Sequence, residues 1–234
     1  MKPVLIFEHI ESSNAGLFAE FLQEHDVPLE VIYPNQGDEI PGSDSLSAWS
    51  GLCFLGGTES VASPTPAMVE EMALIRSARE LNLPMIGHCL GGQLISQALG
   101  GEVRKHDVEE FGWSTLIPES TALLAEWIPQ PPKRLVAMQW HSDSFSIPPG
   151  ATKILGGEYC ENQAFVDGNV LGMQFHIEIN LDSIRHWAID LEDKHPPESP
   201  SVQSGETIMS MNDENFPASR KIAWQLYERW LAFL

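Results

Sequence analysis

A cysteine lies between a short apolar run and a helix-like run, in the stretch MIGHCLGGQLISQALGG. Gly87 comes two residues before Cys89, and Gly91 and Gly92 come two and three residues after it. A nucleophile elbow needs such small neighbours, because its sharp strand-to-helix turn brings adjacent backbone close. The start of the helix would also place positive potential beside the sulfur and favour the thiolate. Cys89 is therefore a candidate nucleophile, and a buried cysteine in a glycine-rich core turn is the alternative.

A cysteine nucleophile needs a base, and His176 is the best placed of the eight histidines. It lies in the strand-like segment GMQFHIEI, with Glu178 two residues further on. Side chains two positions apart on a strand share a face, so Glu178 can orient the imidazole and stabilise its charged form. A His–Glu pair without a catalytic role is the alternative. His88 should point away from Cys89, and His141 in QWHSD is a candidate pocket wall; both are less suited as the base.

Attack of a thiolate on a carbonyl creates an oxyanion, which backbone N–H groups stabilise. The N–H of Leu90 directly follows the candidate nucleophile. The loop FLGGTES (54–60) ends another expected parallel strand and offers the N–H of Gly57 as a second donor. Ligands of such sheets bind at the carboxyl ends of the strands, where both groups would lie. The two glycines of this loop are also compatible with a plain strand-to-loop turn.

The elements that would position these residues alternate along the first hundred residues. Strands are predicted at 3–7, 28–33, within 46–57 and at 84–88, and helices at 14–25, 66–81 and 90–101. This alternation predicts an α/β fold with a mostly parallel central sheet and helices on both faces.

The rest of the sequence is richer in strands. Strands are predicted at 102–105, 112–117, 134–142, 151–159, 163–168 and 169–179, with a hairpin turn at 167–169 and a helix at 181–193. Residues 195–217 are rich in proline, serine and acidic residues, so we expect a long loop that is dispensable for folding. Residues 218–234 predict a C-terminal helix with Ile222, Leu226, Trp230 and Phe233 on one side. We expect a single domain over 1–234.

Composition excludes several classes of partner. Lys and Arg total 13 against 33 Asp and Glu, a formal charge of −20, which repels nucleic acid and anionic membranes. No run approaches the ~20 apolar residues that span a bilayer, and the first residues do not form a signal-peptide pattern. Three scattered cysteines predict neither a disulfide framework nor a zinc site, and GGQLISQ lacks the Lys-Ser/Thr of a phosphate-binding loop. We therefore expect a cytoplasmic protein without metal or cofactor.

These motifs together resemble those of class I, triad-type glutamine amidotransferases. GHCLGGQ is similar to their G-x-C-x-G-x-Q nucleophile motif, FLGGTESV to their oxyanion loop, and GMQFHIEI to their closing Q-F-H-x-E motif, all in the same order. The similarity spans residues 3–192. The stretch QWHSDSFSIPPGA is similar to the central H-x-D…P-x-G-A stretch of the stand-alone branch that resembles the amidotransferase portion of GMP synthase. The resemblance implies a flavodoxin-like amidotransferase fold.

The resemblance also implies a mechanism. Cys89 would attack the side-chain amide of glutamine, and Gly57 and Leu90 N–H groups would hold the oxyanion. His176 would protonate the departing ammonia and then activate water to cleave the γ-glutamyl thioester, with Glu178 orienting the imidazole.

Further positions match the family's substrate-binding residues. Gln93 matches the position that helps to hold the bound glutamine. The backbone around Trp140, Ser142 and Asp143 matches the segment that meets the amino-acid head group. The sequence departs from the family at a few positions: Thr58, Glu59, His88 and Ile177.

Three functions remain open at this point. The first is a glutaminase-type amidotransferase that acts alone or supplies ammonia to a synthetase partner. The second is a γ-glutamyl peptide or γ-glutamyl amine hydrolase with the same triad. The third is a non-catalytic binding protein on this fold, against which the intact Cys/His/Glu set argues. No feature of the sequence predicts the ammonia acceptor or the oligomeric state.

Overall fold

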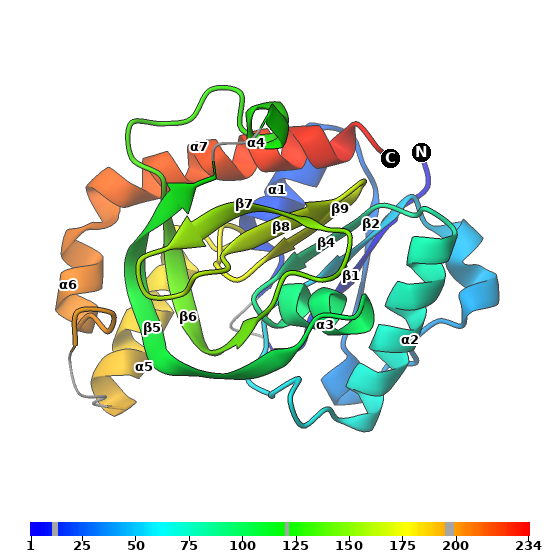
Figure 1. Cartoon of the computed structure of the whole chain (residues 1–234), viewed down its shortest axis with the longest axis horizontal. Coiled ribbons are helices and arrows are strands. Elements are labelled where there is room, and N and C mark those ends of the chain that lie inside the picture. The colour runs from blue at the N-terminus through cyan, green and yellow to red at the C-terminus, as the bar shows by residue number, and fades with distance from the viewer. Residues whose placement is uncertain (11–13, 120–121, 195–198) are drawn as a thin grey trace.

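The computed structural model describes residues 1–10, 14–119, 122–194 and 199–234. The strands of these residues are β1 (Val4–Phe7), β2 (Leu29–Ile32), β3 (Gly51–Phe54), β4 (Met85–His88), β5 (Val103–Pro118), β6 (Val136–Phe145), β7 (Thr152–Gly157), β8 (Ala164–Asp167) and β9 (Val170–Met173). They form one mixed sheet in the order β2-β1-β3-β4-β9-β8-β7-β5-β6 (Figure 1). The strands from β2 to β9 in this order pair in parallel, and those from β9 to β6 pair antiparallel.

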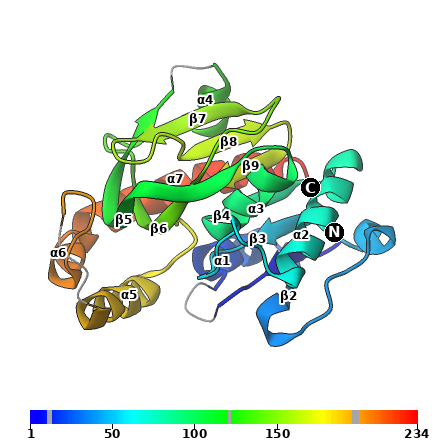
Figure 2. The same ribbon diagram turned by 60° about the horizontal axis from the view of Figure 1, so that its bottom comes forward.

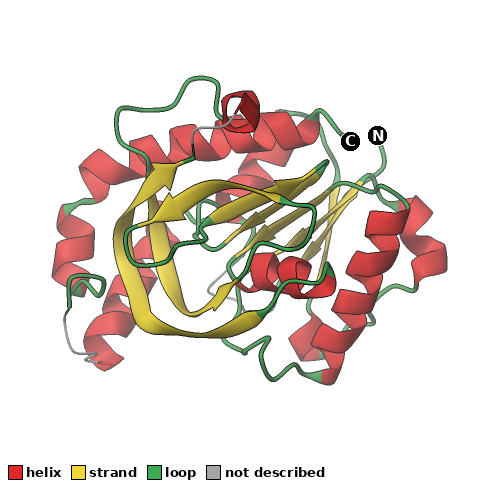
Figure 3. Cartoon of the chain, in the orientation of Figure 1, coloured by secondary structure: helices red, strands yellow, loops and turns green. Residues whose placement is uncertain are grey.

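Helices cover both faces of the parallel half (Figure 3). The helices are α1 (Gly16–Glu24), α2 (Pro66–Glu80), α3 (Leu90–Ala98), α4 (Ala122–Trp127), α5 (Leu181–Lys194), α6 (Gly205–Ser210) and α7 (Asn212–Leu231), with two short 3-10 turns, η1 (Pro34–Gln36) and η2 (Ser43–Ala48). Alternate residues of β1 pack on opposite sides: Val4 and Ile6 with α1 and α7, Leu5 and Phe7 with α2 and α3. The predicted α/β sheet with helices on both faces is confirmed.

The antiparallel half differs in detail from its prediction. Residues 102–105 and 112–117 were expected to be separate strands, but β5 runs unbroken through both and pairs with β6 along most of its length. A shift in register between Lys105 and Glu110 accommodates the irregular segment. The side chains between the two predicted strands are polar and largely exposed, so they carry no alternating pattern. The hairpin between β8 and β9 is confirmed, with Gly168 at φ +62° in its turn.

A third apolar cluster joins the edge of the sheet to α5 and α6, which lie beside β5 and β6 (Figure 2). Trp113 of β5 and Met138 of β6 pack against Trp187 of α5 and Ile208 of α6. This cluster brings α5 close to the strand that carries the QWHSD stretch. No helix in the described part of the chain is long and apolar enough to cross a membrane.

The expected loop at 195–217 is wrong for most of its length. Residues 195–198 lie outside the described residues, but 205–210 form α6 and α7 already begins at Asn212. Ser204 caps α6 by accepting a hydrogen bond from the Thr207 N–H. Gln203 bonds both backbone groups of Trp113, and Ile208 is fully buried. Polar composition concealed these contacts, because one buried isoleucine and a few capping groups anchor the segment. The predicted apolar side of the C-terminal helix is confirmed at Ile222, Leu226 and Trp230, which are all buried.

Replacing Ile208 by alanine should destabilise the protein, because the change leaves a cavity between α5, α6 and β5. A buried Ile→Ala change costs about 2–5 kcal/mol of unfolding free energy. Ile189→Ala is the matched control, since Ile189 lies on α5 with 62% of its surface exposed. Denaturant unfolding monitored by circular dichroism would compare the two variants. Equal stability of both would show that α6 is not anchored as described.

Candidate active site

Cys89 lies at the turn from β4 into α3, with φ 49° and ψ −108°. This backbone conformation is costly for a residue with a Cβ, and it persists only where the surroundings fix it. The Cys89 N–H donates to the Met173 carbonyl at 2.9 Å, and the Cys89 carbonyl accepts from the Gln93 N–H at 2.9 Å. The turn is therefore held by β9 on one side and by the first bond of α3 on the other.

The glycines around Cys89 are required by close backbone approach. A Cβ on Gly91 would lie 2.0 Å from the Phe54 carbonyl oxygen, and one on Gly92 would lie 2.2 Å from the Met173 carbonyl oxygen. A Cβ on Gly87 would meet the Gly91 backbone at 2.5 Å. Without side chains at these positions, α3 packs directly against the ends of β3 and β9. The sequence prediction that the glycines clear space for a sharp turn thus has a specific geometric basis.

His176 and Glu178 lie beside the end of β9. Strand β9 ends at Met173, so the predicted strand over 169–179 is too long. His176 instead forms an isolated bridge to β6, where its N–H donates to the Met138 carbonyl at 2.8 Å. Its Nδ1 is 2.6 Å from Glu178 Oε1, and both side chains are buried. The two residues therefore make the expected contact, although the backbone between them is not a regular strand.

Charge coupling within this group outweighs its burial. Burial alone would lower the pKa of His176, but the Glu178 carboxylate, together with charge and hydrogen-bond interaction with Cys89, raises it above the usual range. Burial likewise opposes ionisation of Glu178, and His176 nevertheless keeps the pKa of that carboxyl below its usual range. The arrangement stabilises an imidazolium between a carboxylate and the cysteine sulfur.

Two amide side chains surround the sulfur. Cys89 Sγ is 3.7 Å from the Trp140 carbonyl oxygen and 3.8 Å from Gln174 Nε2. The Gln93 Nε2 group donates to the Asp143 carbonyl oxygen at 3.2 Å and to Gln174 Oε1 at 3.3 Å. Gln174 was not among the predicted site residues, although it lies in the closing motif two residues before the histidine.

The sulfur faces a cavity of about 330 Å³. Of the residues selected from the sequence, those that line the cavity are Gly57, Cys89, Leu90, Gln93, Trp140, Ser142, Asp143 and His176. Glu178 lies behind His176 and does not line it. Residues that were not selected also contribute: Ile10, Thr58, Glu59, Ser60, Phe111, His141, Trp187 and Asp190. No short motif marks the last two, because α5 reaches the cavity only through the packing of the third cluster.

The two other histidines considered as bases have different surroundings. His88 is fully buried, with Nε2 3.1 Å from Tyr227 Oη and 4.0 Å from Glu178 Oε2. Burial lowers the pKa of His88 to about 4, so this ring is neutral near pH 7. Both nitrogens of His141 are engaged, with the Asp143 carbonyl oxygen and with Glu110. Neither ring has a described hydrogen bond with Cys89.

Adding one methyl group to the turn should disrupt it. Gly92→Ala would push a Cβ into the Met173 carbonyl that holds Cys89, so both stability and Cys89 alkylation should fall. Gly150→Ala is the control: nothing lies within 4 Å of its Cβ, and its φ of +88° adds only left-handed strain, about 1–2 kcal/mol. Thermal unfolding and alkylation rates would compare the variants. Equal tolerance of the two substitutions would show that close packing around Cys89 is not essential.

Comparison with known proteins places this geometry in a family. The family model described as glutamine amidotransferase class-I matches residues 9–188. The glutamine-hydrolysing subunit of GMP synthase from Sulfolobus acidocaldarius is 34% identical over 140 residues, which cover 58% of this chain and 71% of that relative. The glutamine-hydrolysing GMP synthase of Clostridium kluyveri is 30% identical over 170 residues; the match covers 70% of this chain but only 30% of that protein.

The structural comparison extends over the whole chain. The crystal structure of a glutamine amido transferase from Methylobacillus flagellatus superposes with a TM-score of 0.94 at 36% identity, covering 100% of this chain and 96% of that one. The expected flavodoxin-like amidotransferase fold is thereby confirmed. With its matching family model, this chain belongs to the class I glutamine amidotransferase family, whose members are cysteine-dependent enzymes.

Proposed function

We propose that this protein hydrolyses the side-chain amide of glutamine through a γ-glutamyl thioester on Cys89 and releases ammonia. The observation that carries the proposal is the connected set of Cys89, His176 and Glu178 beside a cavity. The nucleophile sits on a strained turn, the histidine is coupled to its sulfur, and a buried carboxylate fixes the histidine. These are the parts that acyl transfer by a cysteine requires.

The first half of the reaction forms the thioester. The Cys89 thiolate attacks the amide carbon of glutamine, and the carbonyl oxygen takes up negative charge. The N–H groups of Gly57 and Leu90 are the proposed donors to this oxygen; both residues line the cavity. The first N–H groups of a helix have no partner within it, so the Leu90 N–H at the start of α3 is suited to this role. His176 then donates its Nε2 proton to the leaving nitrogen, which departs as ammonia.

The second half hydrolyses the thioester. His176 Nε2, now unprotonated, takes a proton from water, and the resulting hydroxide attacks the thioester carbon. The C–S bond breaks, glutamate leaves, and the thiolate is restored beside the imidazolium. Glu178 remains ionised throughout and holds Nδ1, so that Nε2 faces the sulfur and the substrate.

The remaining wall of the cavity suits an amino acid. Its described lining residues include the carboxylates of Glu59, Asp143 and Asp190 but no lysine or arginine. These acids favour the α-ammonium group of the substrate. We propose that Gln93 and the segment Trp140–Asp143 position the head group, with Ser60 fixing the Asp143 carboxylate by a hydrogen bond.

The fate of the ammonia follows from the relatives. One of those named above is a whole GMP synthase and the other is a component of one, and both are called glutamine-hydrolysing. This chain spans less than a third of the C. kluyveri protein. We therefore propose that the ammonia passes to a synthetase partner, and that the cytoplasm, where free glutamine is available, is the site of action.

A second candidate function is supported by the aromatic wall of the cavity. The rings of Phe111, Trp140, Trp187 and His176 follow one another with centroid separations of 5.2, 5.3 and 4.8 Å. This wall extends from the proposed acid–base residue and could receive the leaving group of a γ-glutamyl amine. The same triad would then release the amine in place of ammonia.

Product analysis separates the two functions. The purified protein is incubated with glutamine and, separately, with γ-glutamyl amines of increasing leaving-group size, and the released glutamate is measured. The proposal expects glutamate and ammonia from glutamine. Faster turnover of an aromatic or aliphatic γ-glutamyl amine, with little ammonia from glutamine, would replace it by the second function. Turnover of neither, together with no labelling of Cys89 by a glutamine-like alkylator, would overturn both.

Variants of His176 and Glu178 should differ in severity. His176→Ala removes both acid and base, so turnover should fall by the full contribution of such a group, about 10²- to 10⁴-fold. Glu178→Gln keeps the shape and should cost less. Exposed His186, on α5, provides the control substitution His186→Ala. Equal and mild losses for the first two variants would mean that another histidine is the base, with His141 the first to test.

The pH dependence of Cys89 alkylation tests the coupling itself. Glu178 raises the pKa of His176, so the imidazolium that supports the thiolate persists to high pH in the native protein. In Glu178→Gln the pKa of His176 should fall, and the imidazolium should be lost at lower pH. We expect the pH–rate profile for alkylation to change shape in this variant. Identical profiles would contradict the proposed role of the carboxylate.

A further inference from the structure

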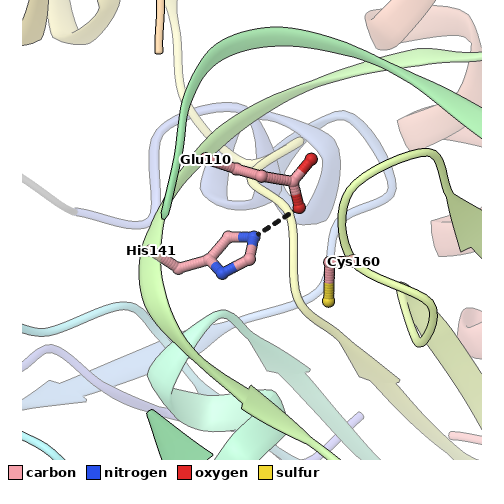
Figure 4. A group of neighbouring side chains, drawn as sticks. All are labelled: Glu110, His141 and Cys160. Atoms are coloured by element: carbon pink, nitrogen blue, oxygen red, sulfur yellow. Dashed lines mark hydrogen bonds and ion pairs between the residues drawn. The ribbon is translucent and has the colours of Figure 1, made fainter. Parts of the chain in front are cut away.

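A second group of chemically active side chains lies behind the cavity wall (Figure 4). Glu110 comes from β5, His141 from β6, and Cys160 from the connection between β7 and β8. One ligating atom from each lies within 4.8 Å of the other two, and all three residues are buried. Neither His141 nor Cys160 has a place in the reaction proposed above, and Glu110 is a carboxylate only 1% exposed.

The hydrogen bonds of His141 define what can occupy this group. Its Nδ1 is 3.0 Å from the Asp143 carbonyl oxygen, which can only accept, so Nδ1 carries a proton. In a neutral ring Nε2 then presents a lone pair, and it faces Glu110 Oε2 at 3.0 Å. A lone pair and a carboxylate oxygen at this distance need a positive charge between them. That charge is either a second proton or a metal ion.

Other contacts favour the metal ion. Glu110 Oε1 is buried and has no hydrogen-bond partner among the described residues, so the carboxylate retains an unused ligating atom. Gln163 Nε2 donates to Glu110 Oε2 at 2.9 Å, and Gln139 holds Gln163 in turn. A histidine whose second nitrogen donates to a carbonyl, beside a carboxylate fixed by an amide, is the usual outer arrangement of a metal centre.

We propose that Glu110, His141 and Cys160 bind a divalent transition-metal ion of the zinc type. Carboxylate, imidazole and thiolate are all ligands of Zn²⁺, and three protein ligands leave a position for water. Binding removes the proton from the Cys160 thiol, and the thiolate, the carboxylate and the neutral imidazole donate electron pairs to the ion without any redox change.

The site has an access route and a structural consequence. Cys160 borders a second cavity of about 320 Å³, which Arg104, His106 and Glu161 also line. An ion and its remaining water ligand can enter from that side, away from Cys89. On the other side, His141 lies between Trp140 and Ser142, which line the substrate cavity. Because the Asp143 carbonyl accepts from both His141 and Gln93, a bound ion would fix the proposed head-group segment.

Cobalt titration of the full chain tests the proposal. Cys89 is first blocked with the glutamine-like alkylator, because Cys89 and His176 could themselves ligate a soft ion. The metal-stripped protein is then titrated with Co²⁺. We expect one equivalent to bind, with thiolate-to-cobalt charge-transfer absorption and visible bands of low coordination number, and Zn²⁺ to displace it. Absence of the charge-transfer band, or only weak binding of several equivalents, would overturn the proposal and leave a buried His–Glu ion pair.

Two cysteine variants locate the site. Cys160→Ser should abolish the charge-transfer band and weaken binding by more than the about 10- to 100-fold typical of losing an outer-shell partner. Cys53→Ala is the matched control, since Cys53 is also a buried free cysteine but lies in β3. Retention of the band in Cys160→Ser would assign the metal elsewhere and refute the site. If Cys160→Ser does not fold, the band in the blocked Cys53→Ala protein still decides the question, because Cys160 is then its one remaining free thiol.

Discussion

The backbone of Cys89 adopts a left-handed conformation that a residue with a Cβ holds only when its surroundings impose it. Those surroundings are the ends of three parallel strands. The Cys89 N–H is bound by the end of β9, and the glycines of α3 lie directly on the carbonyls at the ends of β3 and β9. The parallel half of the sheet, with fully buried strands and helices on both faces, provides the rigidity that this turn requires.

The antiparallel half of the sheet supplies what the turn alone lacks. β6 pairs with His176, carries the Trp140 carbonyl to within 3.7 Å of the sulfur, and bears the proposed head-group segment. The third apolar cluster, between this edge and α5, brings Trp187 against His176. Burial of an imidazolium is unfavourable by itself, so the ionised pair with Glu178 is needed to retain the charge. The two halves of the sheet thus supply the nucleophile and its charged environment.

The sequence predicted the parts of this molecule that local patterns encode. Glycines at fixed offsets from Cys89, and Glu178 two residues after His176, are short-range features, and the structure brings these residues together as expected. The missed features depend on contacts across the chain. The polar middle of β5 forms a strand because β6 pairs with it, and α6 is anchored by Ile208 within a cluster from four elements. Glu110, His141 and Cys160 meet only through strand pairing and a loop, so their spacing carries no metal motif.

The central claim is that Cys89 carries the glutamyl group during turnover. Acid quenching during hydrolysis of glutamine, followed by proteolysis and mass spectrometry, would test it directly. The account predicts a γ-glutamyl adduct on the peptide that contains Cys89, and its absence, together with loss of ammonia release, in Cys89→Ser. Ammonia release by Cys89→Ser, or an adduct confined to Cys53 or Cys160 in the native protein, would contradict it.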